Sequence, residues 1–424
     1  MKKLSRKIVW LLLAVFVVTV GSGFSARKTA ELPAAGETVS GFCAEKAERL
    51  EETGGRIIYL THEASGAAVV YIESTAAPAL TLAARTANGV RRLTLTADSA
   101  EELLRGAKES LGAFFGGEET APDGNGAYRA FLGYLLPGSD AAGDGASEVT
   151  AENLLAVVCA GAESAGSVLA WLDGVFSGAP TGETFAPDAA YQRIEKPVEE
   201  TAEITGDEAG GVYFGIVCPR AGEWTRIRLA AVAAALGRSG SLLDKRVRAS
   251  LPDAAVSCGT ETAGADEALW FFAPGLEEKD AEAFRDAVLA ALRTLAGSGL
   301  SAQAVETLEA AQRLEELTFP ERDDLGAALC DGFAAAWAQG DAGGYPAQLR
   351  EAWNAAEYLA DGSCAEVVRE ELLENERTAL LTVMPEPAKE PEPTPEPTPE
   401  ATPEPTEEPA KENPSVSPAA SQLP

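Results

Sequence analysis

The side chains that could do hydrolytic chemistry are few, and histidine is the scarcest of them. His62 is the only histidine among 424 residues. A helical zinc-peptidase motif needs two imidazoles one turn apart. A serine or cysteine hydrolase needs a base beside its nucleophile, and His62 would be the only imidazole for that role. No Gly-x-Ser-x-Gly elbow or cysteine-flanking signature accompanies it. The sequence therefore predicts no catalytic and no cofactor-binding residues.

A serine–lysine pair is the other nucleophile arrangement that the sequence offers. Ser239 or Ser241 could lie near Lys245, but Ser241 is also placed to cap a helix that starts directly after it. Glu101 and Glu102 fall in the first turn of a predicted helix, where they complement its dipole. Capping and dipole roles explain these residues without chemistry.

The six cysteines are scattered and form no C-x-x-C pair, which predicts neither a zinc ribbon nor a thioredoxin-like centre. Cys159 and Cys218 lie within apolar runs, where free cysteine packs as a small hydrophobic side chain. Export would permit disulfides, but six cysteines cannot be paired from their spacing. The remaining four are Cys43, Cys258, Cys330 and Cys364.

The elements that would position these residues form two successive α+β units. In residues 41–205, aliphatic runs at 56–60 and 67–72 flank a turn at 62–66 and predict a hairpin. Asp98 is placed to cap a helix with an apolar face. Further strands are predicted at 80–85 and 154–159, and helices at 98–114 and 164–176.

Residues 206–384 repeat this pattern. A strand, an acidic turn and an amphipathic helix occur at both 155–176 and 269–295, which suggests duplication of one α+β module. Trp171, Trp270, Trp337 and Trp353 fall on predicted core faces. Strands are predicted at 212–218, 254–259, 268–273 and 379–384, and helices at 227–236, 241–249, 279–295, 301–317, 325–338, 347–359 and 364–373.

The two ends of the chain differ from its body. Residues 1–26 run from basic residues through an apolar stretch to small residues, which is typical of a secretory signal. The apolar stretch also approaches the length of a membrane anchor, so cleavage stays open. Residues 27–40 form a linker. Residues 385–424 hold nine Glu, two Lys and 13 of the 25 prolines, which predicts an extended, disordered tail.

The charge of the chain argues against one class of partner. The formal net charge is −32. So acidic a protein repels phosphate backbones, and nucleic acid is therefore not an expected partner.

The order of these segments resembles the insulinase/pitrilysin-type metallopeptidases, specifically their presequence-protease branch. That branch writes the hairpin turn as His-Glu-Lys-Thr-Gly-Ala, similar to residues 62–67, and a strand end as Phe-Arg-Thr, similar to residues 84–86. The resemblance implies a hairpin turn at His62, where a solvated histidine is expected. It covers residues 41–386, about one half of a full-length presequence protease. The other matching segments are residues 41–42, 98–114, 171–176 and 372–385.

The catalytic core of the resembled family is missing. There, a His-x-x-Glu-His helix lies between the Arg-Thr strand end and the next helix, whereas here only residues 87–97 join them, without histidine. The resemblance places Asp188 nearest to the family's distal metal-ligating Glu. We therefore interpret Asp188 as a vestigial position. One carboxylate without imidazoles is a poor zinc site.

Together these observations predict an α+β fold of two tandem metallopeptidase-like α/β roll modules, each a mostly antiparallel sheet covered by helices. The expected function is an exported, non-catalytic homologue that binds an extended peptide or a metallopeptidase-like partner subunit, without a cofactor. Two alternatives stay open. One is a divergent zinc metallopeptidase, or a subunit of one. The other is a structural protein of the cell surface. The expected location of the exported protein is extracellular or anchored to the outer face of the cytoplasmic membrane.

Overall fold

The computed structural model describes residues 38–51, 53, 55–116, 126–143, 147–204, 210–219 and 223–385. The predicted leader at 1–26, the linker at 27–40 up to residue 37, and the tail at 385–424 beyond residue 385 lie outside them. None of the helices in the described part is long and apolar enough to cross a membrane.

The first sheet has seven strands in the order β1-β2-β3-β4-β7-β5-β6. All neighbours pair antiparallel except β4 and β7, which run parallel. Long aliphatic runs form the central strands, and every residue of β5 and β7 is buried. The strands are β1 (Thr38–Val39), β2 (Phe42–Arg49), β3 (Arg56–His62), β4 (Ala68–Glu73), β5 (Ala79–Thr86), β6 (Gly89–Thr96) and β7 (Leu154–Ala160).

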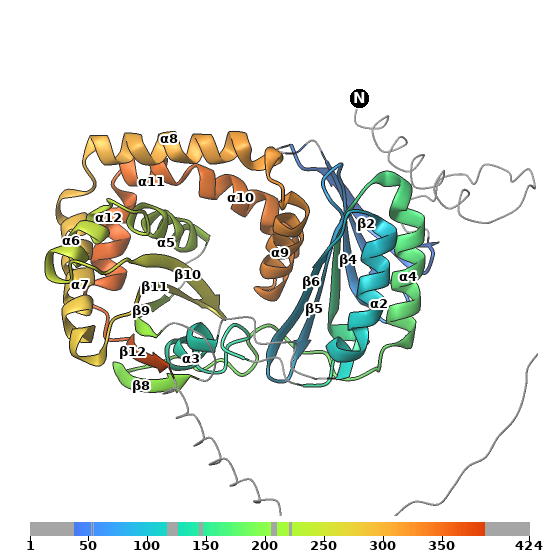
Figure 1. Ribbon diagram of the computed structural model, residues 1–424, viewed down its shortest axis with the longest axis horizontal. Helices are drawn as coiled ribbons and strands as arrows, with labels where there is room; N and C mark the ends of the chain where they lie inside the picture. The colour runs from blue at the N-terminus through green and yellow to red at the C-terminus, as the bar shows by residue number, and fades with distance from the viewer. Residues whose placement is uncertain are drawn as a thin grey trace, which may run out of the picture. The chain divides into compact units, whose positions relative to one another are not determined.

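Helices cover both faces of this sheet because its strands are apolar on both sides (Figure 1). Alternate residues of β7 point to opposite faces, so that Val158 packs with α2 (Ala100–Gly116) and α4 (Ala165–Gly178). Cys159 points to the other face, beneath α9 (Leu325–Ala338). A helix from the second half of the chain thus completes the core of the first sheet.

The second sheet has five strands in the order β10-β11-β9-β12-β8, antiparallel except for the parallel pair β12–β8. One face packs against helices from the second half of the chain. The strands are β8 (Val198–Ile204), β9 (Gly211–Pro219), β10 (Ser257–Ala263), β11 (Asp266–Pro274) and β12 (Thr378–Pro385). The helices are α5 (Glu223–Leu236), α6 (Leu242–Ser250), α7 (Ala281–Ser298), α8 (Ala302–Thr318), α10 (Tyr345–Trp353), α11 (Ala355–Ala360) and α12 (Ser363–Val367).

The other face of the second sheet is covered by α3 (Gly126–Leu135), a helix from the first half of the chain (Figure 1). Phe131 stacks on Tyr213 of β9 with ring centroids 4.8 Å apart. Gly215 permits this approach, because a Cβ there would lie 2.6 Å from the Leu135 side chain. β8, assigned to the unit 41–205 from sequence, also pairs with the second sheet. The two halves of the chain therefore exchange elements.

The predicted fold class is confirmed: the protein is α+β, with two mixed sheets covered by helices. The predicted core positions of the four tryptophans are also confirmed, since each packs against an apolar cluster. The predicted cap of Ser241 is confirmed as well, because its Oγ accepts the Asp244 N–H at 3.0 Å.

Several local predictions were wrong. Residues 87–97 are no mere connection, because they contain β6, which pairs with β5 along its whole length. Ser99 rather than Asp98 begins α2, since its Oγ accepts the Glu102 N–H at 3.3 Å. The helix predicted at 347–359 divides at Asn354 into α10 and α11. The helix predicted at 364–373 is present, but only its first half is α-helical (α12), and Val368–Leu372 form a π-turn.

Candidate functional site

His62 is buried, and the solvated histidine expected there was wrong. It is the last residue of β3, and its side chain turns toward α4 with only 1 % of its surface exposed. The imidazole Nε2 lies 3.1 Å from Asp173 Oδ1, and Nδ1 lies 2.8 Å from Ser65 Oγ. The rings of Phe42 and Phe176 enclose it, at centroid distances of 5.1 and 5.7 Å.

The residue types of this group are those of a serine hydrolase triad, but their environment favours a structural role. The Ser65 hydroxyl also accepts the Ala67 N–H at 3.2 Å and so shapes the hairpin turn. Gly41 has a φ of +77° and closes over the pair, because a Cβ there would lie 2.4 Å from Asp173 Oδ1. The buried imidazole links β3 to α4 through Asp173, and a substrate carbonyl cannot reach it.

Burial also makes the cysteine thiols unreactive. It raises the pKa of Cys159 to about 11 and the pKa of Cys218 to about 12. The pKa values of Cys330 and Cys364 are raised for the same reason. A protonated, buried thiol is a poor nucleophile. These four cysteines are therefore packing residues at neutral pH.

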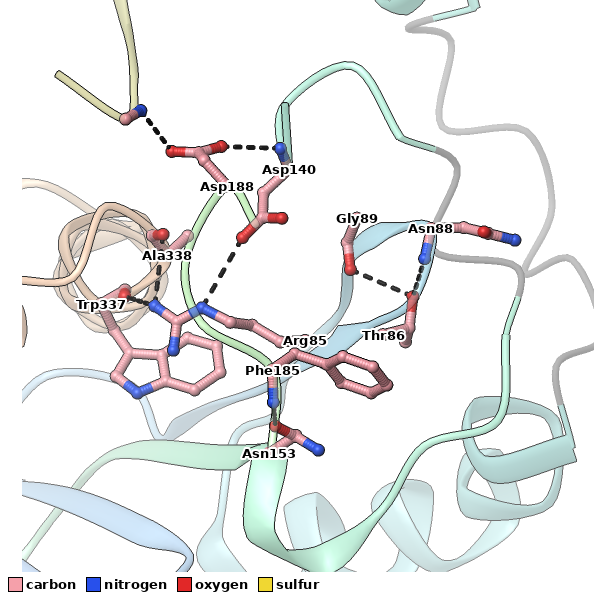
Figure 2. Close-up of polar contacts among 11 residues, drawn as sticks. Arg85, Thr86, Asn88, Gly89, Asp140, Asn153, Phe185, Asp188, Trp337 and Ala338 are labelled. Atoms are coloured by element: carbon pink, nitrogen blue, oxygen red, sulfur yellow. Dashed lines mark hydrogen bonds and ion pairs between the residues drawn. The ribbon is translucent and has the colours of Figure 1, made fainter. Parts of the chain in front are cut away.

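A second polar cluster lies where the chain leaves β5 (Figure 2). Arg85 is 8 % exposed, and its Nη2 donates to the carbonyls of Trp337 and, at 3.2 Å, of Ala338, both at the end of α9. Its guanidinium lies 4.0 Å from the centroid of the Trp337 ring. Its Nε faces Asp140 Oδ2 at 3.6 Å. Arg85 thus joins the first sheet to α9 and to the loop after α3.

Asp188 lies beside this cluster, and both of its carboxylate oxygens are engaged (Figure 2). Oδ1 accepts the Asp140 N–H and Oδ2 accepts the Gly264 N–H, each at 2.8 Å. Its backbone has a φ of +51°, a conformation that Asp and Asn tolerate better than most side chains. Asp188 therefore bridges two backbone segments, one from each half of the chain.

The cluster does not fit a zinc ion. Zinc sites in proteins use imidazole, thiolate and carboxylate donors that converge on one point. Within the described residues, no three such side chains converge in a way that could hold a metal. The carboxylate nearest to the expected ligand position already accepts two backbone N–H groups. No reaction step can be derived through zinc from these donors.

Burial disfavours the charged forms of both Asp140 and Arg85 in this cluster. Burial raises the pKa of Asp140, and the negative charge of Asp188 raises it further. Burial lowers the pKa of Arg85. Each group thus depends on its neighbours to remain ionised, as expected for a structural ion pair in a polar junction.

We expect Asp188→Ala to lower the free energy of unfolding by about 1–2 kcal/mol, because it leaves two backbone donors without an acceptor and strains a positive φ. Asp188→Asn keeps the backbone preference and one carbonyl oxygen, and should lose less. Urea denaturation of the three proteins measures the difference. Equal stability of Asp188→Ala and the parent would contradict the bridging role.

The free edge of β6 is the third candidate site, because its backbone could pair with an added strand. The Ala97 N–H donates to the Pro78 carbonyl, which lies on the side of β5. The Val90 N–H points away from β5 and donates to the Asp140 carbonyl at 3.4 Å. Backbone direction alternates along a strand, so Arg92, Thr94 and Thr96 present N–H and C=O groups outward. Among the described residues, these outward groups have no backbone partner.

The other sheet edges are poorer templates. β1 has only two residues, and β10 carries the carboxylate of Glu261. β8 carries Glu199, Glu200 and Glu203, the kind of charged side chains that discourage strand addition. β6 reads Gly-Val-Arg-Arg-Leu-Thr-Leu-Thr and carries no carboxylate. It is therefore the most suitable described edge for an added strand.

Sequence reasoning named Asp188 but missed what surrounds it. The structure brings Asp188 to Arg85, Asp140 and Trp337, residues far apart in the chain. Arg85 was noted only as part of a motif, and Asp140 was not noted. A buried arginine inside an aliphatic strand is the one signal that pointed to a polar junction, because such a charge needs partners.

Comparisons with known proteins test the fold. No protein-family model matches the sequence, and no curated protein is similar to it in sequence. A protease from Helicobacter pylori has a similar structure, with a TM-score of 0.55 and 14 % identity, over 78 % of this chain and all of that one. The inactive domain of an M16 peptidase from Pseudomonas fluorescens matches with a TM-score of 0.50 and 11 % identity, over 79 % of this chain and all of that one.

These matches support the predicted resemblance at the level of the fold and do not reach the presequence-protease branch. At such low identity they carry over neither activity nor ligands. Two mixed sheets with shared covering helices, and whole-domain similarity to an M16 domain, agree on one conclusion: this chain has the fold of the M16, insulinase-type peptidases.

Proposed function

We propose that this chain is an exported, non-catalytic M16-like protein that binds extended peptides by adding them to β6 as a further strand. The observation that carries the proposal is the free edge of β6, where three consecutive outward-facing residues offer backbone donors and acceptors. Strand addition takes its affinity from main-chain hydrogen bonds and needs no metal.

The surroundings of His62 and Asp188 favour a binding role over a catalytic one. The only histidine is enclosed between two phenylalanine rings, and Asp188 is occupied by backbone donors. The similar domain from Pseudomonas fluorescens is itself described as inactive. A divergent zinc peptidase is the competing proposal. Stoichiometric zinc in the purified protein, with peptide cleavage that chelation abolishes, would favour it.

Thr94→Pro tests strand addition directly. The substitution removes an outward N–H of β6 and leaves the hydrogen bonds to β5 in place, a position where an edge strand accepts proline. We expect it to weaken binding of unstructured neutral peptides at least tenfold, about 1.4 kcal/mol. Fluorescence anisotropy with labelled peptides measures the affinity.

Thr94→Val is the matched control. The Thr94 hydroxyl donates to Asp331 at 2.6 Å, and valine removes this contact while keeping the backbone N–H. We expect the valine variant to bind peptides as the parent does. If both variants bind equally well, or if the parent binds no extended peptide, strand addition to β6 is refuted.

Export and the role of a partner subunit are further parts of the proposal. The predicted leader supports export, and cell fractionation with mass analysis of the mature N-terminus tests it. Leu314 and Leu317, one turn apart on α8, are 62 % and 59 % exposed. An apolar pair at this position favours contact with a partner protein as a second candidate role.

A further inference from the structure

Two of the six cysteines meet in the layer between the first sheet and α9. Cys159 lies on β7 and Cys330 on α9, and both belong to the apolar cluster that this helix completes. Each side chain is 0 % exposed. The pairing of these cysteines, which their spacing along the chain left open, can therefore be judged from their positions in the fold.

The sulfur of Cys330 lies against the strand pair that contains Cys159. It donates to the Ala79 carbonyl of β5 at 3.6 Å. Ala79 and Cys159 are opposite each other in the β5–β7 ladder, where paired Cα atoms lie about 4.5–5.5 Å apart. Burial raises the pKa of Cys330, the neighbouring Cys159 thiol raises it further, and a hydrogen bond from the Cys159 backbone N–H opposes the rise. The Cys330 sulfur therefore lies over residue 159.

The helix α9 packs closely against the sheet at this point, because small residues face each other. Gly326 lies one turn before Cys330, and a Cβ there would lie 2.4 Å from the Ala77 carbonyl oxygen and 3.3 Å from the Ala79 Cβ. A disulfide requires Cα atoms within about 7 Å of each other. Large side chains would hold a helix too far from a sheet for such a bond, whereas the glycine and alanine contacts shorten this distance.

The other four cysteines have different surroundings. Cys218 and Cys364 donate to backbone carbonyls of the second half of the chain, at 3.4 and 3.6 Å. Cys43 lies on β2, and Cys258 lies on β10. In the part of the chain that the structure describes, the contacts thus bring one pair of thiols together, that of β7 and α9.

We propose that Cys159 and Cys330 form an intramolecular disulfide when the chain folds in an oxidising compartment, and that this bond fixes α9 on the first sheet. The proposal is independent of peptide binding and needs only the environment that export would provide. Each thiol loses a proton, the pair loses two electrons, and one S–S bond forms. The electrons reduce one disulfide of a low-molecular-weight or protein oxidant to two thiols, through a mixed disulfide with one of the cysteines.

The burial of both thiols determines when the bond forms. A protonated thiol beneath a helix reacts poorly, so the exchange must take place before α9 has covered the sheet. Once the bond is closed, the same burial keeps reductants away from it. The bond closes a loop of roughly 170 residues and so restricts the unfolded chain, which stabilises the folded state. Packing alone also accounts for two buried cysteines, and oxidation of the chain distinguishes the two roles.

The test is oxidative refolding of the full chain. Protein that has been reduced and unfolded in urea is refolded with reduced and oxidised glutathione, and its free thiols are labelled with a maleimide under denaturing conditions. We expect four labels per molecule out of six cysteines, and six labels after reduction. Mass spectrometry of a tryptic digest should identify one cross-linked pair of peptides, which contain Cys159 and Cys330.

Variants assign the bond to this pair. Cys159→Ala and Cys330→Ala should each leave five free thiols, because the remaining cysteine has lost its partner. Cys218→Ala/Cys364→Ala removes two buried thiols elsewhere and should retain the cross-link. Reduction should lower the urea midpoint of the parent and leave that of Cys159→Ala/Cys330→Ala unchanged. Dithiothreitol should cleave the bond at least tenfold more slowly in native buffer than in urea.

Six reactive thiols after oxidative refolding would overturn the proposal. A bond that joins another pair of cysteines, or two separate molecules, would do the same. A cross-link that leaves the urea midpoint unchanged would refute its stabilising role. None of these results bears on strand addition to β6, which the peptide-binding measurements test separately.

Discussion

Replacing Phe333 with alanine is expected to lower the free energy of unfolding by about 3–5 kcal/mol. Phe333 lies on α9 with no exposed surface, in the apolar layer between this helix and the first sheet. Its ring packs against Tyr59 of β3 and Tyr345, at centroid distances of 6.3 and 4.8 Å. The close-packed layer would retain a cavity where the ring had been.

Denaturant unfolding, followed by tryptophan fluorescence and by far-ultraviolet circular dichroism, measures this effect. Phe333→Leu keeps most of the buried volume and should cost less than half as much. Because α9 and α3 each cover the sheet of the other half, both signals should change at one denaturant concentration. Two separate transitions, with only one sensitive to Phe333→Ala, would contradict the exchange of helices.

Arg85→Ala is expected to cost about 3 kcal/mol or more, because it leaves buried acceptors and the Asp140 carboxylate without their cation. The guanidinium contacts three groups at once: the Trp337 ring, the backbone carbonyls at the end of α9, and Asp140. Arg85→Lys keeps the charge but loses the planar stacking and the forked donors, and should recover only part of the stability.

The pH dependence of Arg85→Ala identifies the carboxylate responsible. The pKa of Asp140 is raised in the folded state, first by burial and then by Asp188. A raised acid pKa makes a contribution that is fully present below the unfolded value, about 3.9, and is lost as the pH rises through the folded value. The deficit of Arg85→Ala should therefore shrink as the pH falls from 7 toward 4.

A double-variant cycle provides the control. Asp140→Ala removes the carboxylate but keeps the backbone bonds of residue 140 to Asp188 and Val90. Arg85→Ala/Asp140→Ala should be more stable than the sum of the single effects predicts. Strict additivity, or a deficit that is independent of pH, would show that Arg85 acts through Trp337 and α9 alone.

The sequence predicted the fold best where apolar patterns were long. The runs at 154–159 and 212–218 became β7 and β9, and Ser241 and Ser301 capped helices as expected. The strand β6 was not predicted because Arg91 and Arg92 interrupt its apolar pattern. Arg91 is nevertheless buried, and its Nη1 donates to the Phe114 carbonyl of α2 at 2.7 Å, a contact that no local pattern contains.

The candidate sites were harder to predict for the same reason. His62 follows a strand and precedes turn residues, so its sequence neighbours indicate exposure. Its burial is set by Asp173, 111 residues away. The thiols of Cys159 and Cys330 likewise meet although they lie on a strand and a helix that are far apart in the chain. Spacing along the chain shows the motifs, but not which of them meet.

The covering of the first sheet by α9 has a consequence for biosynthesis. Thr81 of β5 donates to Asp331 of α9 across 250 residues. A nascent chain completes β7 long before α9 exists, and at roughly 5–20 residues per second the interval is on the order of ten seconds or more. Throughout that time the aliphatic face of β4, β5 and β7 lacks the helix that covers it in the folded protein, and its apolar side chains are open to solvent or to chaperones. The core of the first sheet is therefore completed only after α9, which is synthesised late in the chain, has been made.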